Sequence, residues 1–185
     1  WGLAGAPTKW NGITVLPGFG ANYCTPSLSQ HAKVVNPDLI ITLGDIWVMD
    51  PTLLKGLPIA HWLPGDCRPM STVDRMEAEN SGARLIAMSK FGYQRFQDAG
   101  FVNALYCQHG IDTETFRPAE DREDLRDAFG LDKDTFLVGI NAANNDAIRK
   151  AAPEMLLAFA KFHQTHPDAM IALHAGVHQD GGQDL

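Results

Sequence analysis

His61 and Asp66 lie at the end of the apolar run 58–63 and could carry out acid–base chemistry. Imidazole and carboxyl groups are the side chains that most often move protons in enzymes. In open α/β sheets, ligands bind just beyond the carboxyl ends of the strands. A buried strand ending at His61, followed by a loop that carries Asp66, therefore predicts a catalytic pair beside a ligand. The alternative interpretation is that His61 is a packed strand-end residue.

A second group of polar residues follows the apolar run 136–140 and contains Asn141, Asn144, Arg149 and Lys150. Helix N-termini attract phosphate through their free N–H groups and their dipole, and Arg and Lys add positive charge. Cations at a helix start are otherwise unfavourable, so the group predicts a phosphate site. The alternative is a pair of solvated surface cations. The GxxxxGK[ST] pattern of a P-loop is absent.

Other polar residues give weaker signals. Asp45 follows an apolar run, where it could bind a hydroxyl group or, more commonly, cap a helix. The segment 17–20 is Gly-rich without GxGxxG and indicates a tight turn. The remaining histidines and the three cysteines show no metal-ligand spacing, and no cofactor is predicted. Reduced thiols without a CxxC pattern favour a cytoplasmic protein.

These residues must be positioned by an alternation of short apolar runs and longer amphipathic segments. Nearly continuous apolar runs are typical of parallel strands covered on both faces. Ser71 and Ser89 are candidate helix caps. The strands are predicted at 13–16, 38–43, 58–63, 84–88, 104–107, 136–140 and 170–174, and the helices at 27–35, 71–80, 89–99, 122–129 and 150–163.

The order of strands and helices predicts an α/β doubly wound fold with Rossmann-type parallel sheets. A polar, acidic stretch broken by Pro118 separates two such series, which predicts two domains, 1–113 and 114–185.

The chain has 185 residues and a net charge of −7, most of it after residue 113. This balance disfavours nucleic acid as a partner, since phosphate contacts need clustered Lys and Arg. No apolar run approaches the ~20 residues of a membrane-spanning helix.

Several segments in this order resemble a known family. Residues 83–101, ARLIAMSKFGYQRFQDAGF, resemble the strand–Ser–helix–Gly segment of GT-B glycosyltransferases of the retaining family 4 kind, including enzymes of bacteriophages and actinobacteria. Residues 106–118, YCQHGIDTETFRP, resemble that family's interdomain hallmark, here Gly-Ile-Asp followed by Phe and Pro. Residues 136–159 are similar to the strand, loop and helix that bind the nucleotide diphosphate, and the family's lysine matches Lys150.

The resemblance implies a GT-B-like pair of Rossmann-type domains. Such an enzyme transfers a sugar from a nucleotide-diphospho-sugar donor to an acceptor, here unidentified, with retention of the anomeric configuration. The first domain would hold the acceptor and the second the donor. Lys150 and Arg149 would neutralise the departing diphosphate, and His61 matches a histidine that contacts the transferred sugar. The cations and the helix dipole would replace a metal.

The chain also departs from the family. The usual Gly-Arg after the first strand of the second domain is absent, Asn141 and Asn144 occupy that loop, and Arg149 is the candidate replacement. Because two such domains need roughly 300–400 residues, a partial chain, inactive by itself, is expected. Alternatives are a sugar-nucleotide epimerase or phosphorylase of the same fold, or a non-catalytic binding or assembly module. Exposed sheet edges would favour a homo-oligomer.

Overall fold

The computed structural model describes residues 5–144, 146 and 148–176, and the chain divides into two compact units. The first unit is Trp1–Asp112 and the second is Thr113–Leu185. The division falls in the acidic stretch that separates the two series of strands and helices. Each unit has its own parallel sheet and is described by itself.

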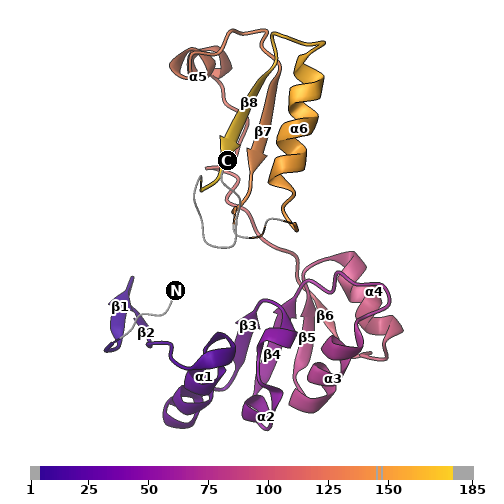
Figure 1. Cartoon of the computed structure of the whole chain (residues 1–185). Helices are drawn as coiled ribbons and strands as arrows, with labels where there is room; N and C mark the ends of the chain where they lie inside the picture. Colours follow the sequence, from indigo (N-terminus) through magenta and orange to yellow (C-terminus); the bar gives the residue numbers. More distant parts are fainter. Residues whose placement is uncertain (1–4, 145, 147, 177–185) are drawn as a thin grey trace. The chain divides into compact units, whose positions relative to one another are not determined.

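The first unit is built on a parallel sheet with the strand order β3-β4-β5-β6 (Figure 1). The strands are β3 (Ile40–Leu43), β4 (Ile59–Leu63), β5 (Arg84–Ala87) and β6 (Leu105–Tyr106). Strands that follow one another in the sequence are neighbours in the sheet and pair in parallel. Since parallel crossovers are right-handed, successive connections of this order pass over the same face.

Ser71 and Ser89 cap two of these connecting helices, as the sequence predicts. The Ser71 hydroxyl accepts the N–H of Asp74 at 3.0 Å, and the Ser89 hydroxyl accepts the N–H of Gly92 at 2.9 Å. The short helix α2 was missed, although Asp50 caps it by accepting the N–H of Thr52 at 2.9 Å. The helices are α1 (Ala21–Val35), the 3-10 turn η1 (Ile46–Val48), α2 (Pro51–Leu54), α3 (Thr72–Ser81) and α4 (Lys90–Asp98).

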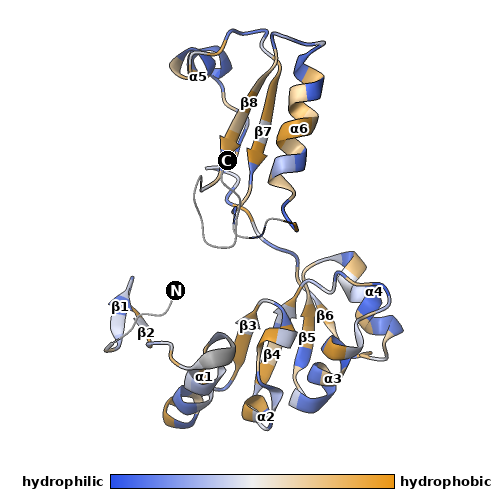
Figure 2. Ribbon diagram, viewed as in Figure 1, coloured by the Kyte–Doolittle hydropathy of each residue, from blue (hydrophilic) through white to orange (hydrophobic). Residues whose placement is uncertain are grey.

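One face of this sheet is well covered by the described residues, and the other is largely exposed on the edge strand β3. On β3, Ile40 and Thr42 are buried, whereas the alternate residues Ile41 and Leu43 are 59% and 63% exposed. Figure 2 shows that the strands are nonetheless mostly apolar, with a few polar interruptions, whereas α3 and α4 are mixed. The expectation of cover on both faces is therefore not met in the described part, because all connections from β3 to β6 lie on one side.

The predicted strand at 13–16 does not belong to the parallel sheet. Residues Ile13–Val15 form β2, which pairs antiparallel with β1 (Thr8–Trp10) in a hairpin. The two linking residues, Asn11 and Gly12, have φ values of 47° and 80°. Two positive φ values fit the two-residue turns that match strand twist, for which Asn-Gly is the favoured pair. That dipeptide is the sequence signal that could have revealed the hairpin.

Gly92 allows α4 to pack against the loop after β4. A Cβ at Gly92 would lie 2.2 Å from the carbonyl oxygen of Pro64, and one at Gly65 would lie 2.8 Å from the ring of Phe96. Phe96 is fully buried in the core that this helix forms with β4 and β5. The absence of a side chain at Gly92 thus sets the distance between α4 and the loop that carries Asp66.

Gly92→Ala is expected to destabilise the first unit by about 1–3 kcal/mol, the usual cost of forcing atoms into a packed interior. Urea unfolding followed by tryptophan fluorescence measures it, because all four tryptophans lie in this unit. Gly110→Ala is the matched control, since no atom lies within 4 Å of its added Cβ. Equal unfolding midpoints for the two variants would contradict the prediction.

The second unit is a parallel pair of strands with an amphipathic helix. Its elements are α5 (Arg122–Ala128), β7 (Leu137–Asn141), α6 (Ala152–His163) and β8 (Met170–His174). β7 and β8 pair in parallel over their whole length. Phe136, just before β7, contacts Phe162 of α6 with ring centres 5.9 Å apart, and Phe159 and Phe162 lie 6.4 Å apart within the helix. The helix begins at Ala152, so the prediction that it begins at Lys150 is wrong by two residues.

Both units are thus mixed α/β structures in which helices flank parallel strands, as in Rossmann-like folds. In each unit, polar loops follow the carboxyl ends of the strands. In open α/β sheets, ligands bind at the edge formed by these carboxyl ends.

Candidate functional site

His61 lies within β4 rather than at its end, because the strand continues through Trp62 to Leu63. Only 1% of the residue is exposed. Its Nδ1 is hydrogen-bonded to the hydroxyl of Thr42, the residue opposite it on β3, at 2.5 Å. Its Nε2 is buried and has no hydrogen-bond partner in the described part. The sequence prediction of a strand-end histidine is corrected: the ring is enclosed between the sheet and its helices.

Burial lowers the pKa of His61 to about 4, because a charged ring would lose its hydration. The ring is therefore neutral at pH 7. A neutral imidazole with one unpartnered nitrogen can donate or accept a hydrogen bond. It is a poor general base at neutral pH, since an effective base has a pKa near the working pH.

A hollow of about 340 Å³ lies beside the residues that hold His61. Thr42, the partner of His61, lines it together with Met49 and the start of α1. The His31 ring closes another side through a 2.9 Å hydrogen bond from Nε2 to the carbonyl oxygen of Pro17. The Thr42 hydroxyl thus links an open hollow to the buried ring. Sequence reasoning missed this hollow, because residues from three separate segments line it.

Asp66 lies among carboxyl groups from neighbouring loops. The pKa of Asp45 is raised first by burial and then by the charges of Asp66 and Asp74. The pKa of the exposed Cys67 thiol is raised mainly by Asp66, whose Oδ1 lies 3.6 Å from Sγ. Asp45 follows β3, and its side chain makes no capping hydrogen bond to η1. Asp45 and Asp66, in the loops after β3 and β4, therefore form an acidic cluster with Asp74 of the first turn of α3.

Carboxylate oxygens accept hydrogen bonds, so this acidic cluster can bind hydroxyl groups. Its negative charge disfavours an anionic ligand at the same place. No hydrogen bond joins His61 to Asp66 in the described residues, and the two side chains that the sequence paired are not a bonded couple. The charge of Asp66 acts instead on Asp45, whose pKa it raises.

A third group of side chains lies near the ends of β4 and β6. The Trp62 Nε1–H donates to the carbonyl oxygen of Cys107 at 2.7 Å. The ring of His109 lies 4.9 Å from the Trp62 ring, and its Nε2 lies 3.0 Å from the Met88 sulfur. Sequence reasoning gave His109 no role. His109 lies two residues after the strand predicted to end at Cys107, and this spacing could have indicated a position at the carboxyl end of the sheet.

In the second unit, the predicted asparagines join the loops after the two strands. The Asn141 Oδ1 lies 3.0 Å from Nδ1 of His174, the last residue of β8. The Asn144 side chain is buried, and its Nδ2 donates to the carbonyl oxygen of Gly176 at 3.0 Å. Both contacts fix the loop before α6 against the carboxyl end of β8. The asparagines thus have structural partners within this unit.

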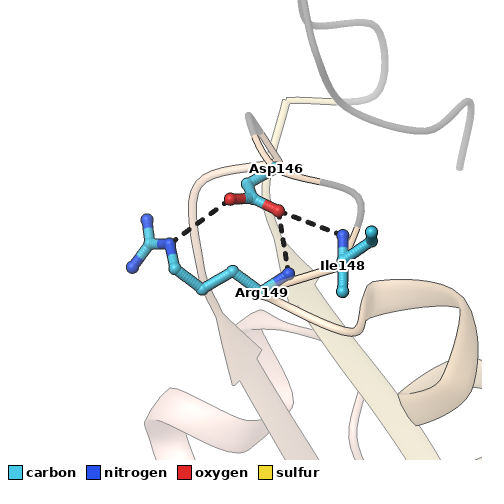
Figure 3. Close-up of polar contacts among 3 residues, drawn as sticks. All are labelled: Asp146, Ile148 and Arg149. Carbon is cyan, nitrogen blue, oxygen red and sulfur yellow. Dashed lines mark hydrogen bonds and ion pairs between the residues drawn. The ribbon is translucent and has the colours of Figure 1, made fainter.

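Arg149 is held by an acid that sequence reasoning did not include (Figure 3). One carboxylate oxygen of Asp146 accepts the backbone N–H groups of Ile148 at 3.1 Å and Arg149 at 2.8 Å. The other lies 3.6 Å from the Arg149 Nε. These contacts lower the pKa of Asp146, chiefly through the Arg149 N–H bond. Arg149 is thus partly neutralised by a carboxylate in its own turn.

Lys150 follows this turn, and its side chain makes no ion pair or hydrogen bond in the described part of the chain. Its backbone N–H donates to the carbonyl oxygen of Asp146 at 3.4 Å. No side chain caps α6, which starts two residues later. An unpaired ammonium group and an uncapped helix start are the features that attract an anion.

Among the described residues, no group of three His, Cys, Asp or Glu side chains could hold a metal ion. Within the same residues, every helix is too short or too polar to cross a bilayer. Comparison with protein-family models finds no matching family, and comparison with curated proteins finds no match. The function is therefore inferred from the residues and the fold.

Proposed function

We propose that this protein is a glycosyltransferase of the GT-B type that moves a sugar from a nucleotide-diphospho-sugar donor to an acceptor with retention. The observation that carries the proposal is Lys150, in the polar loop between β7 and α6, whose side chain has no ion-pair or hydrogen-bond partner among the described residues. Departure of a nucleoside diphosphate requires stabilisation of its developing negative charge. An ammonium group beside an uncapped helix start supplies that stabilisation without a metal.

The proposal assigns the diphosphate to Lys150 first and to Arg149 second. Asp146 already engages Nε of Arg149, so this guanidinium can offer only its remaining N–H groups. Asn141 and Asn144 hold the loop against β8, and their role is to position it. This differs from the expectation that both asparagines contact the diphosphate directly.

The acidic cluster Asp45, Asp66 and Asp74 favours an uncharged acceptor rich in hydroxyl groups. Carboxylates accept hydrogen bonds from hydroxyls and repel phosphates. Asp66 is proposed to act on the acceptor hydroxyl as a hydrogen-bond or proton acceptor. His61, neutral and buried, is proposed to fix Thr42 at the wall of the neighbouring hollow rather than to exchange protons.

The experiment combines calorimetric titration with nucleoside diphosphates and an assay for nucleoside diphosphate release from sugar nucleotides. Binding, together with release that depends on a carbohydrate acceptor, is the expected result. Epimerised sugar nucleotide without acceptor would favour an epimerase of the same fold. No heat at millimolar nucleoside diphosphate would contradict the donor site and favour a non-catalytic module.

A further inference from the structure

Three arginines surround a small hollow on the helical side of the first unit. It has a volume of about 290 Å³ and is lined by Arg68, Arg75 and Arg95 with Pro69, Met70, Asp98 and Ala99. The arginines come from the loop after β4, from α3 and from α4. A convergence of three guanidinium groups is unexpected in a chain of net charge −7.

The three arginines are only partly neutralised. Arg75 uses Nε for Glu79 at 2.9 Å, and both side chains are about half exposed. Arg95 uses Nη2 for Asp98 at 2.9 Å. Arg68 makes no ion pair or hydrogen bond in the described part of the chain. With Glu79 and Asp98 paired to two of the three arginines, the group keeps an excess of one positive charge.

Arg95 is preorganised for a ligand. Its side chain is only 13% exposed, and the guanidinium carbon lies 5.2 Å from the centre of the Phe91 ring. Its Nε is buried and has no partner in the described part. A buried donor without an acceptor is costly, and an oxyanion can supply acceptors to the guanidinium group.

We propose that this hollow, formed by Arg68, Arg75 and Arg95, is a binding site for a phosphate monoester group. A phosphate monoester offers three strong acceptor oxygens, which suit the donors of three guanidinium groups better than the two oxygens of a carboxylate do. Arginine forks bind phosphate oxygens in pairs. The volume is at the lower end of the ~300–1,000 Å³ range of ligand pockets and suits a single headgroup.

The apolar side chains of Pro69 and Met70 form part of the wall, so an apolar portion of the ligand can lie beside the phosphate. The phosphate can come from a soluble phosphate ester or from a phospholipid headgroup. This site does not depend on the proposed transferase activity, because its residues lie in the first unit and outside the loop that carries Lys150.

The test is NMR titration of the whole chain with inorganic phosphate, followed through backbone amide shifts of residues 68–70 and of α4. Arg68→Gln and Arg75→Gln are each expected to weaken binding about tenfold, the loss for one hydrogen bond to a charged group. Arg95→Lys keeps the charge and loses the fork, and is expected to weaken binding to a similar degree. Arg84→Gln, an exposed arginine outside the hollow, is the control and should bind as the parent does.

A soluble phosphate ester and a phospholipid headgroup are distinguished as ligands with phosphatidylcholine vesicles that contain phosphatidic acid. Co-sedimentation that Arg68→Gln abolishes supports a lipid headgroup, whereas phosphate binding without co-sedimentation supports a soluble ester. The proposal is overturned if millimolar phosphate causes no shifts at residues 68–70. It is also overturned if Arg84→Gln loses as much affinity as Arg68→Gln, because binding then reflects diffuse charge.

Discussion

We expect Lys150→Ala to weaken the binding of a nucleoside diphosphate about 10- to 100-fold. The physical reason is the loss of a hydrogen bond between two charged groups, worth about 1.5–3 kcal/mol. The ammonium group of Lys150 has no competing partner in the described residues, so its full charge is available to the ligand. Calorimetric titration of the parent and the variant with the same nucleoside diphosphate measures the change.

Two further variants serve as comparisons for Lys150→Ala. Arg149→Ala should lower the affinity for nucleoside diphosphate less than Lys150→Ala does, because the Arg149 Nε already lies 3.6 Å from a carboxylate oxygen of Asp146. Lys161→Ala removes an exposed ammonium group from the far end of α6 and should leave affinity unchanged. Unchanged affinity in Lys150→Ala would remove its proposed role. A larger loss in Arg149→Ala would assign the diphosphate to the guanidinium instead.

The positions of most helices and strands could be predicted because their signals are local. Ser71 and Ser89 precede their helices, and the hydroxyl groups cap them as expected. The uncovered sheet face could not be predicted in this way. The run that contains Ile41 and Leu43 is as apolar as a strand buried on both sides, yet both residues are exposed. Which face is covered depends on the order of strands in the sheet, which hydropathy does not encode.

The candidate sites show the same division between local and distant information. Asp146 lies three residues from Arg149, so their pairing is a local contact that the sequence could have indicated. The link from His61 to Thr42 joins two strands and appears only when β3 and β4 are paired in register. Likewise, the effect of Asp66 on the pKa of Asp45 could not be predicted before β3 and β4 were known to be neighbours. The sequence thus indicated Asp66 and Asn144 in loops that follow strands, but it placed His61 at a strand end and missed the partners of these residues.

The first unit is expected to lose about 3 kcal/mol of stability through His61 as the pH falls from about 6.5 to about 4. Burial lowers the pKa of His61 to about 4 from an ordinary value of 6.5. Between these values the unfolded chain binds a proton that the folded ring does not, so protonation favours unfolding. The stabilising effect of the neutral ring is complete above pH 6.5. The size follows from about 1.4 kcal/mol for each pH unit between the two pKa values.

Urea unfolding at a series of pH values, followed by tryptophan fluorescence, measures this slope. Carboxyl groups also titrate in the range, so the decisive quantity is the difference between the parent and His61→Asn. The asparagine amide keeps a polar partner for Thr42 and takes up no proton. The free energy of unfolding of His61→Asn should therefore fall by about 3 kcal/mol less than that of the parent between pH 6.5 and pH 4. An unchanged slope in His61→Asn would mean that the ring is hydrated or charged in the folded protein, and that Thr42 and the neighbouring hollow are not held by a neutral imidazole.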